Sequence, residues 1–214
     1  NNFEVYSIAE GKTRINAYYL KGDQEKAKAC ANFASDLMKF YSQRFGEYPY
    51  KDFNIVASYL GYGGLQSSGQ VFIDTRVYKL PGFLHRYFDF LISHETGHQW
   101  FYNIIGSDEY REMFLDEGIN SYWLLEYLEN KYGKDAEVMD LPKSLKWLIP
   151  NFSFRQSTVN RYIYLAKNGL DRPVIGELSS FQEPSSIFAL TYGKGAAVLS
   201  MLEKQLGSEV FAKI

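Results

Sequence analysis

The first part of the chain alternates apolar and polar residues, whereas the rest mostly repeats apolar residues every three or four positions. Residues 3–20 alternate around Glu10-Gly11-Lys12, which predicts a short hairpin or an entry strand. Residues 52–60 and 70–78 have the composition of two further strands, separated by the Gly- and Ser-rich loop GYGGLQSSG. We therefore expect these two strands to form a hairpin or the edge of a sheet.

Four later stretches have the helical period, which predicts amphipathic helices. The first helix begins after Asp23, a residue type that caps helices, and its apolar face ends before the stop signal Gly46. The others are predicted at 83–105, 116–132 and 193–206, the last two stopped by Gly133 and Gly207.

The region 141–184 contains several prolines and no persistent period, so we expect shorter helices and loops there. Neither an internal repeat nor a low-complexity tract interrupts the chain. With 214 residues the chain can form one large domain or two small ones and bury a substantial core.

Composition excludes several classes of protein. The hydrophobic share of 46% and the charged share of 22% are those of an ordinary globular protein. A net charge of −2 with no basic block argues against a nucleic-acid partner. The single cysteine, Cys30, excludes an internal disulfide framework.

The chain has no apolar run of about 18 residues and no signal-peptide pattern at its start, so we expect no membrane segment. It begins without Met and ends in the helix-like stretch 211–214, and we interpret it as an excised piece of a longer protein. The cellular compartment is not indicated.

The stretch ISHETGHQWF, residues 92–101, holds two of the three histidines of the chain. Residues four apart lie on the same face of a helix, so His94 and His98 can point their ring nitrogens at one cation, about 2.0–2.1 Å from each. Glu95 projects beside them. In this pattern the histidines hold zinc and the glutamate takes a proton from water.

A catalytic zinc site needs a third protein ligand, and Glu117 is the candidate. It lies in FLDEGINSY, at the start of the next predicted helix, and two His and one Glu would leave the fourth position open. His85 is better explained as a surface or packing residue. The alternative is that the motif arises by chance in a polar helix, but chance would also have to explain the Glu117 spacing.

The chain resembles the gluzincin aminopeptidases typified by aminopeptidase N. The resemblance rests on His94-Glu95-Thr96-Gly97-His98, on Glu117 after eighteen intervening residues, and on HQWF and LDEG in their usual places. Tyr48-Pro49-Tyr50, the loop GGLQSSGQVFI and Tyr192-Gly193-Lys194-Gly195 follow in the family's order. The resemblance therefore extends over nearly the whole chain.

This resemblance implies an α+β fold with a thermolysin-like catalytic domain. Its small mixed β-sheet subdomain and mainly helical subdomain would hold zinc in the cleft between them. Residues 23–214 would be the catalytic domain, and residues 1–22 a remnant of the junction with a missing N-terminal β-domain. The other partners expected are a peptide substrate and further domains of the same full-length protein.

The resemblance also implies a role for each site residue. His94, His98 and Glu117 correspond to the zinc ligands, and Glu95 to the general base. Tyr192 corresponds to the tyrosine that stabilises the oxyanion, although a tyrosine that merely packs at a helix start is the alternative.

The substrate-binding loop contains the one departure from the family pattern. Gly63 and Gly64 keep the glycines that let the loop backbone approach a peptide, but Gln66 stands where the family has a glutamate that binds the substrate's free amino group. Charge-assisted bonds are about twice as strong as neutral ones.

Three functions follow in order of preference. The first is a zinc metallopeptidase of aminopeptidase type. The second is an endopeptidase, or a peptidase with altered N-terminal specificity, because Gln66 is neutral. The third is a non-catalytic zinc-retaining peptide-binding module, against which the presence of Glu95 and Tyr192 argues.

Overall fold

The computed structural model describes residues 2–181 and 183–213. The chain divides into two compact units. The first unit comprises residues 1–104 and 138–151, and the second comprises residues 105–137 and 152–214. Each unit has its own architecture.

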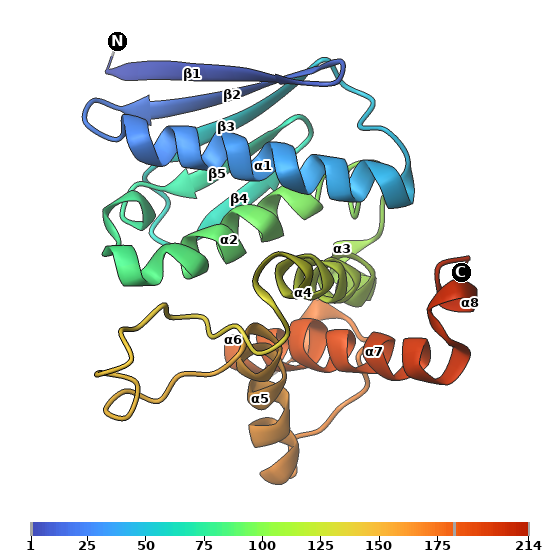
Figure 1. Cartoon of the computed structure of the whole chain (residues 1–214). Coiled ribbons are helices and arrows are strands. Elements are labelled where there is room, and N and C mark those ends of the chain that lie inside the picture. Colours follow the sequence, from blue (N-terminus) through green and yellow to red (C-terminus); the bar gives the residue numbers. More distant parts are fainter. Residues whose placement is uncertain (1, 182, 214) are drawn as a thin grey trace. The chain divides into compact units, whose positions relative to one another are not determined.

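The first unit is built on a five-stranded mixed sheet with the order β1-β2-β3-β5-β4 (Figure 1). β1 and β2 form the predicted hairpin, and the tight turn between them uses Gly11 at a φ of 56°. β2, β3 and β5 are parallel neighbours, whereas β4 pairs antiparallel with β5 at the edge. The strands are β1 (Phe3–Glu10), β2 (Thr13–Leu20), β3 (Asp52–Ser58), β4 (Gly64–Ser67) and β5 (Gln70–Asp74).

The two strands predicted around GYGGLQSSG therefore do not form a hairpin with each other. The loop itself contains β4, which occupies the sheet edge beside β5. Both flanking strands are also shorter than predicted, since β3 ends at Ser58 and β5 at Asp74.

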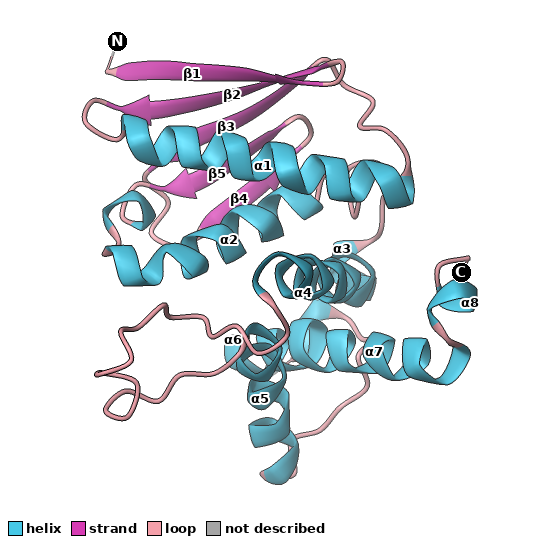
Figure 2. Ribbon diagram, viewed as in Figure 1, coloured by secondary structure: helices cyan, strands magenta, loops and turns pink. Residues whose placement is uncertain are grey.

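Two helices, α1 (Gln24–Phe45) and α2 (His85–Gly97), cover one face of the sheet (Figure 2). On this face β3 and β5 present only buried apolar side chains, as strict alternation allows: Phe53, Ile55, Ala57, Val71 and Ile73. The face of α1 that the sequence predicted is buried, and Gly46 ends the helix at a φ of 95°. Asp23 stands at the N-cap position, but its side chain binds Lys79 and makes no capping bond.

Aromatic residues close the core beside these helices. The Tyr41 ring of α1 lies 5.3 Å from Trp100 and 6.0 Å from Phe101, centroid to centroid, in edge-on geometry. Trp100 and Phe101 are buried, with exposed fractions of 1% and 6%. The short turns η1 (Val77–Lys79) and η2 (Gly82–Leu84) join β5 to α2.

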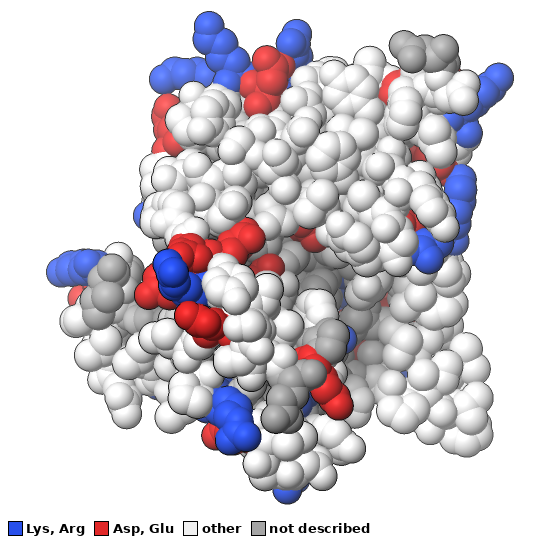
Figure 3. Space-filling model, turned by 180° about the vertical axis from the view of Figure 1, so that it is seen from behind, with Lys and Arg blue, Asp and Glu red and all other residues white. Residues whose placement is uncertain are grey.

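On the opposite face of the sheet, the described residues of this unit form no helix. Side chains in register form an apolar row across all five strands, with polar neighbours beside it. Few charged side chains lie over this face, and most of those visible are at its rim (Figure 3). The row consists of Val5, Tyr18, Val56, Phe72 and Leu65.

The second unit is helical. Helices α4, α5 and α7 pack together, and Arg155 on α5 joins them by binding Glu126 and Glu129 on α4 and Ser200 on α7. The described elements are α3 (Glu109–Met113), η3 (Phe114–Gly118), α4 (Ile119–Tyr132), α5 (Phe154–Lys167), η4 (Leu178–Ser180), α6 (Pro184–Ile187), η5 (Phe188–Lys194), α7 (Gly195–Leu206) and α8 (Ser208–Phe211).

The helices predicted at 116–132 and 193–206 are present, but each begins with a π-helical turn, η3 or η5. The region 141–184 contains a full helix, α5, which starts with a capping box between Ser153 and Gln156. No helix in the described part of the chain has the length and apolar character needed to cross a membrane.

Candidate metal centre

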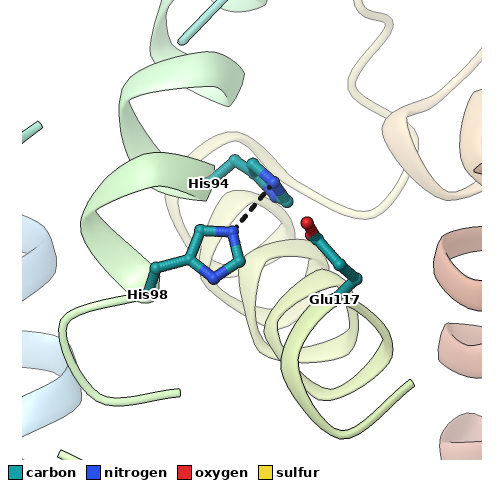
Figure 4. A group of neighbouring side chains, drawn as sticks. All are labelled: His94, His98 and Glu117. Carbon is teal, nitrogen blue, oxygen red and sulfur yellow. Dashed lines mark hydrogen bonds between the residues drawn. The ribbon is translucent and has the colours of Figure 1, made fainter. Parts of the chain in front are cut away.

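The two histidines of the sequence motif stand at the C-terminal end of α2. His94 is 9% exposed and His98 is fully buried. Their Nε2 atoms lie 3.1 Å apart, and the two rings are nearly perpendicular (Figure 4). Both imidazoles thus present the same nitrogen to one point.

The spacing of these nitrogens fits a zinc ion. Two nitrogen ligands at 2.0–2.1 Å in tetrahedral geometry lie about 3.3 Å from each other, close to the distance between His94 and His98. Imidazole nitrogens are also among the donors that zinc prefers. The donor set and its geometry therefore agree with the expected metal.

The helix that carries the motif is shorter than predicted, because it ends at Gly97 and not near Ile105. His98 is its C-cap residue and keeps right-handed helical angles, with φ of −62° and ψ of −11°. The two histidines therefore still share one face. The chain then turns through Tyr102, whose φ of 99° makes it the one non-glycine residue with positive φ among those described.

After this turn the chain returns to the end of the helix. The backbone N–H and the side-chain amide of Asn103 both donate to the carbonyl oxygen of His98, at 3.1 and 2.7 Å. Ser68 donates to the Asn103 side chain at 2.8 Å. Asn103 thus links the end of α2 to the turn between β4 and β5.

Gln99 makes a second link to the same turn, and the sequence alone did not single it out. Its fully buried amide accepts from Gly69 N–H at 2.9 Å and from the Tyr48 hydroxyl at 3.2 Å. The amide also donates to the Ser67 carbonyl at 3.0 Å. The only sequence signal was its position directly after the second histidine.

Glu95 lies under the backbone of β4 and is 4% exposed. A Cβ placed on Gly64 would stand 2.6 Å from both Cγ and Oε1 of Glu95, and one on Gly63 would stand 3.0 Å from Leu91 Cδ1. The two glycines predicted to permit close approach therefore do so against α2. Whether a peptide also approaches them stays a prediction.

Gln66 is half-buried and sits in β4 opposite Val71 of β5. Since Val71 is on the face of the sheet that the helices cover, Gln66 is on that face too. Its role in binding a substrate amine is not tested by this placement.

The loop leading into β4 is tied to the end of β5 by Asp74. Its carboxylate accepts from the N–H groups of Leu60 and Gly61, and its own N–H donates to Gly63. The Arg76 side chain binds the same carboxylate at 2.8 Å. Hydrogen bonding to Arg76 holds the pKa of Asp74 far below its usual value, and the bonded N–H groups add to this shift.

The predicted third ligand belongs to the second unit. Glu117 lies in the π-helical turn η3 and is 7% exposed, beside the buried Asp116 and Gly118. π-Helical turns are rare and occur frequently at functional sites. Figure 4 labels Glu117 together with the two histidines, and its role as a ligand stays a prediction.

Tyr192 lies in the other π-helical turn of this unit, η5. Its ring is half-buried, 5.1 Å from that of Phe188. Lys194, two residues later, binds the Asp171 carboxylate and the Arg172 carbonyl, both at 2.7 Å. The turn that carries Tyr192 is thereby tied to the segment after α5.

Two histidines four apart around a buried glutamate are typical of the zinc-dependent hydrolases. A comparison with protein families identifies which family of this class the chain matches. Residues 30–214 match the peptidase family M1 domain. The chain therefore belongs to peptidase family M1, and the matched part is the family's peptidase domain.

Similar proteins include several aminopeptidases. The chain is 27% identical to the alanine/arginine aminopeptidase of Saccharomyces cerevisiae over 223 aligned positions, which cover 100% of this chain and 23% of that protein. It is 25% identical to aminopeptidase 2 of Candida albicans, over 93% of this chain and 21% of that protein. Human aminopeptidase N is 32% identical over 56% of this chain and 12% of its own length. The chain thus spans less than a quarter of these relatives.

Proposed function

We propose that the chain is the catalytic part of a zinc-dependent metallopeptidase of aminopeptidase type. The observation that carries this proposal is the pair of histidine Nε2 atoms at the C-terminal end of α2, 3.1 Å apart beside the buried Glu95, in a chain that belongs to peptidase family M1. His94, His98 and Glu117 are a group of residues that could hold a metal ion. Bound zinc would supply Lewis acidity and make water a nucleophile at neutral pH.

Glu95 acts as the general base in this proposal. Its carboxylate takes a proton from the attacking water and delivers it to the nitrogen of the departing amine, so that one side chain serves both steps. The glycine at position 64 supports this role, because it leaves room for the carboxylate below β4.

Tyr192 donates its hydroxyl hydrogen bond to the carbonyl oxygen as negative charge develops there. A preorganised donor of this kind stabilises a transition state by about 3 kcal/mol. Its place in a turn held by Lys194 is consistent with a fixed donor.

The substrate class we propose is a peptide with a free N-terminus. The three relatives described above carry aminopeptidase names, which supports this choice. The neutral Gln66 favours a second candidate, cleavage of internal bonds or of altered N-termini, because an amide binds an ammonium group more weakly than a carboxylate does.

A paired assay separates these functions. Purified chain, with zinc content measured, is given aminoacyl fluorogenic substrates and internally quenched peptides with blocked N-termini. Cleavage of the aminoacyl substrates alone supports the first proposal, and cleavage of blocked peptides supports the second. If neither is cleaved while zinc is bound, a non-catalytic peptide-binding module is favoured. Glu95→Gln is the control for contaminating peptidases.

We further propose that the full-length protein has additional domains, because the relatives are more than four times as long as the part that this chain matches. The assignment of residues 23–214 to the catalytic domain and of residues 1–22 to a domain junction stays a prediction. Comparing the hydrolysis rate of this chain with that of a longer one tests it.

A further inference from the structure

Two residues assigned to the reaction lie in π-helical turns of the same unit. Glu117 is in η3, directly before α4, and Tyr192 is in η5, directly before α7. Such turns are well under 1% of residues in globular proteins. Both Glu117 and Tyr192 therefore depend on how these two rare turns are held against each other.

Two glycines bring the backbones of these segments into contact: Gly118 in η3, and Gly195 at the start of α7, directly after η5. A Cβ on Gly118 would lie 2.9 Å from the Thr191 carbonyl oxygen and 2.5 Å from Phe114 Cδ2. A Cβ on Gly195 would lie 2.9 Å from the Gly118 Cα and 3.0 Å from the same Phe114 atom. Both glycines are buried, and neither has a positive φ, so close approach is what requires a glycine at each position.

The turn η5 is also packed tightly against α5, on the side away from η3. A Cβ on Gly193 would lie 2.9 Å from the Thr158 carbonyl oxygen and 3.3 Å from Tyr162 Cβ, both on α5. Because η5 contacts backbone on both sides, it has little freedom to shift away from η3.

We propose that the contact between Gly118 and Gly195 sets the spacing between Glu117 and Tyr192, and that these glycines are positioning residues for the metal ligand and the oxyanion donor. This inference rests on the proposed function of those two residues. Glu117 adjoins Gly118 in the chain, and Thr191, which Gly118 touches, adjoins Tyr192. A displacement of Gly118 therefore reaches Glu117 through one peptide unit, and a displacement of Thr191 reaches Tyr192 in the same way.

Gly195→Ala is the direct test. The added methyl group meets the Cα of Gly118 and the ring of Phe114, so the two backbones must separate by roughly 0.5 Å to reach ordinary van der Waals contact. Perturbing the support of a metal ligand typically costs 10–100-fold in metal affinity. We expect about a tenfold loss of zinc affinity, measured by competition with a chromophoric chelator, and a tenfold or greater loss of kcat.

Gly82→Ala is the matched control. A methyl group added at position 82 would stand in open space, and the backbone there has no positive φ, so zinc affinity and kcat should equal those of the parent chain. If Gly195→Ala behaves like Gly82→Ala in both measurements, the proposal is wrong. Where Gly195→Ala does not fold, Phe114→Leu loosens the same contact and should weaken zinc binding in the same direction.

A double-mutant cycle with Tyr192→Phe distinguishes positioning from general destabilisation. If Gly195→Ala acts through Tyr192, its effect on kcat shrinks in the Tyr192→Phe background. If the loss of kcat in the double variant equals the product of the two single losses, the part of the proposal that concerns Tyr192 is wrong. A chain that binds zinc but cleaves no peptide refutes the proposed function alone, because the zinc-affinity comparison still decides the claim about Glu117.

Discussion

The two units hold their candidate reactive groups by different physical means. In the first unit, polar side chains do so: Gln99 and Asn103 tie the end of α2 to the turn after β4, and Asp74 ties the loop before β4. In the second unit, two glycines hold them. Because Gly118 and Gly195 have no side chains, the backbones can come into direct contact. Hydrogen-bonded support fails when a partner is removed, whereas steric support fails when an atom is added.

The largest effect is expected from Glu95→Gln, which removes the proposed base from the first unit without adding an atom. General-base catalysis contributes about 10²–10⁴-fold, so kcat should fall by that factor. Zinc content should not change, because both histidines remain. Steady-state kinetics and metal analysis measure the two quantities, and a variant with normal kcat would remove Glu95 from the mechanism.

Tyr192→Phe makes the corresponding change in the second unit. Loss of a donor worth about 3 kcal/mol predicts a fall in kcat on the order of 10²-fold, with KM and zinc affinity unchanged. A rise in KM at constant kcat would instead indicate that the hydroxyl binds substrate and transition state equally.

Gln99→Ala tests the polar support directly. The change leaves the half-buried partners Gly69 N–H and Ser67 C=O without their bonds to the buried amide, at a cost of about 3 kcal/mol in the free energy of unfolding. Thermal unfolding should shift down by about 10 °C. Ser68→Ala removes an exposed bond from the same β4–β5 turn to Asn103 and should change stability by less than about 0.5 kcal/mol. Equal effects of the two changes would contradict the comparison.

Asp74 makes the support of the first unit dependent on pH. Its pKa is lowered in the folded chain, chiefly by the bond to Arg76, so its contribution is fully present above the unfolded value of about 3.9 and is lost as pH falls below it. Asp74→Asn should therefore be less stable than the parent at pH 6, and the difference should narrow below pH 4. Asp52→Asn, at a half-exposed ion pair with Arg14, serves as the control and should change little. A constant difference for Asp74→Asn across pH would refute the linkage.

Gln66→Glu should have the smallest effect and sharpens the question of specificity. A charge-assisted bond in place of a neutral one is worth about 1 kcal/mol, which is roughly a fivefold rise in kcat/KM for substrates with a free amine. N-terminally blocked peptides should not gain. If both substrate types respond alike, Gln66 does not contact the substrate's N-terminus.

Much of the first unit could be predicted because its signals are local. Alternation predicted the β1–β2 hairpin, and the helical period predicted the buried face of α1 and its end at Gly46. The strand β4 was missed because four residues of a Gly-rich loop carry no alternation of their own, and pairing with β5 decides their conformation. The early end of α2 was missed because bonds from Asn103, five residues beyond His98, are not a local signal.

The sequence alone determined which residue types are available for the chemistry: two histidines one helical turn apart, an intervening glutamate, Glu117 at a set spacing, and a neutral Gln66. It could do so because helical spacing and ligand chemistry depend on near neighbours. Only the tertiary structure decided how these groups are held, through a buried amide in one unit and a glycine contact between η3 and the start of α7 in the other. Both depend on residues brought together from distant positions, and neither leaves a periodic trace in the chain.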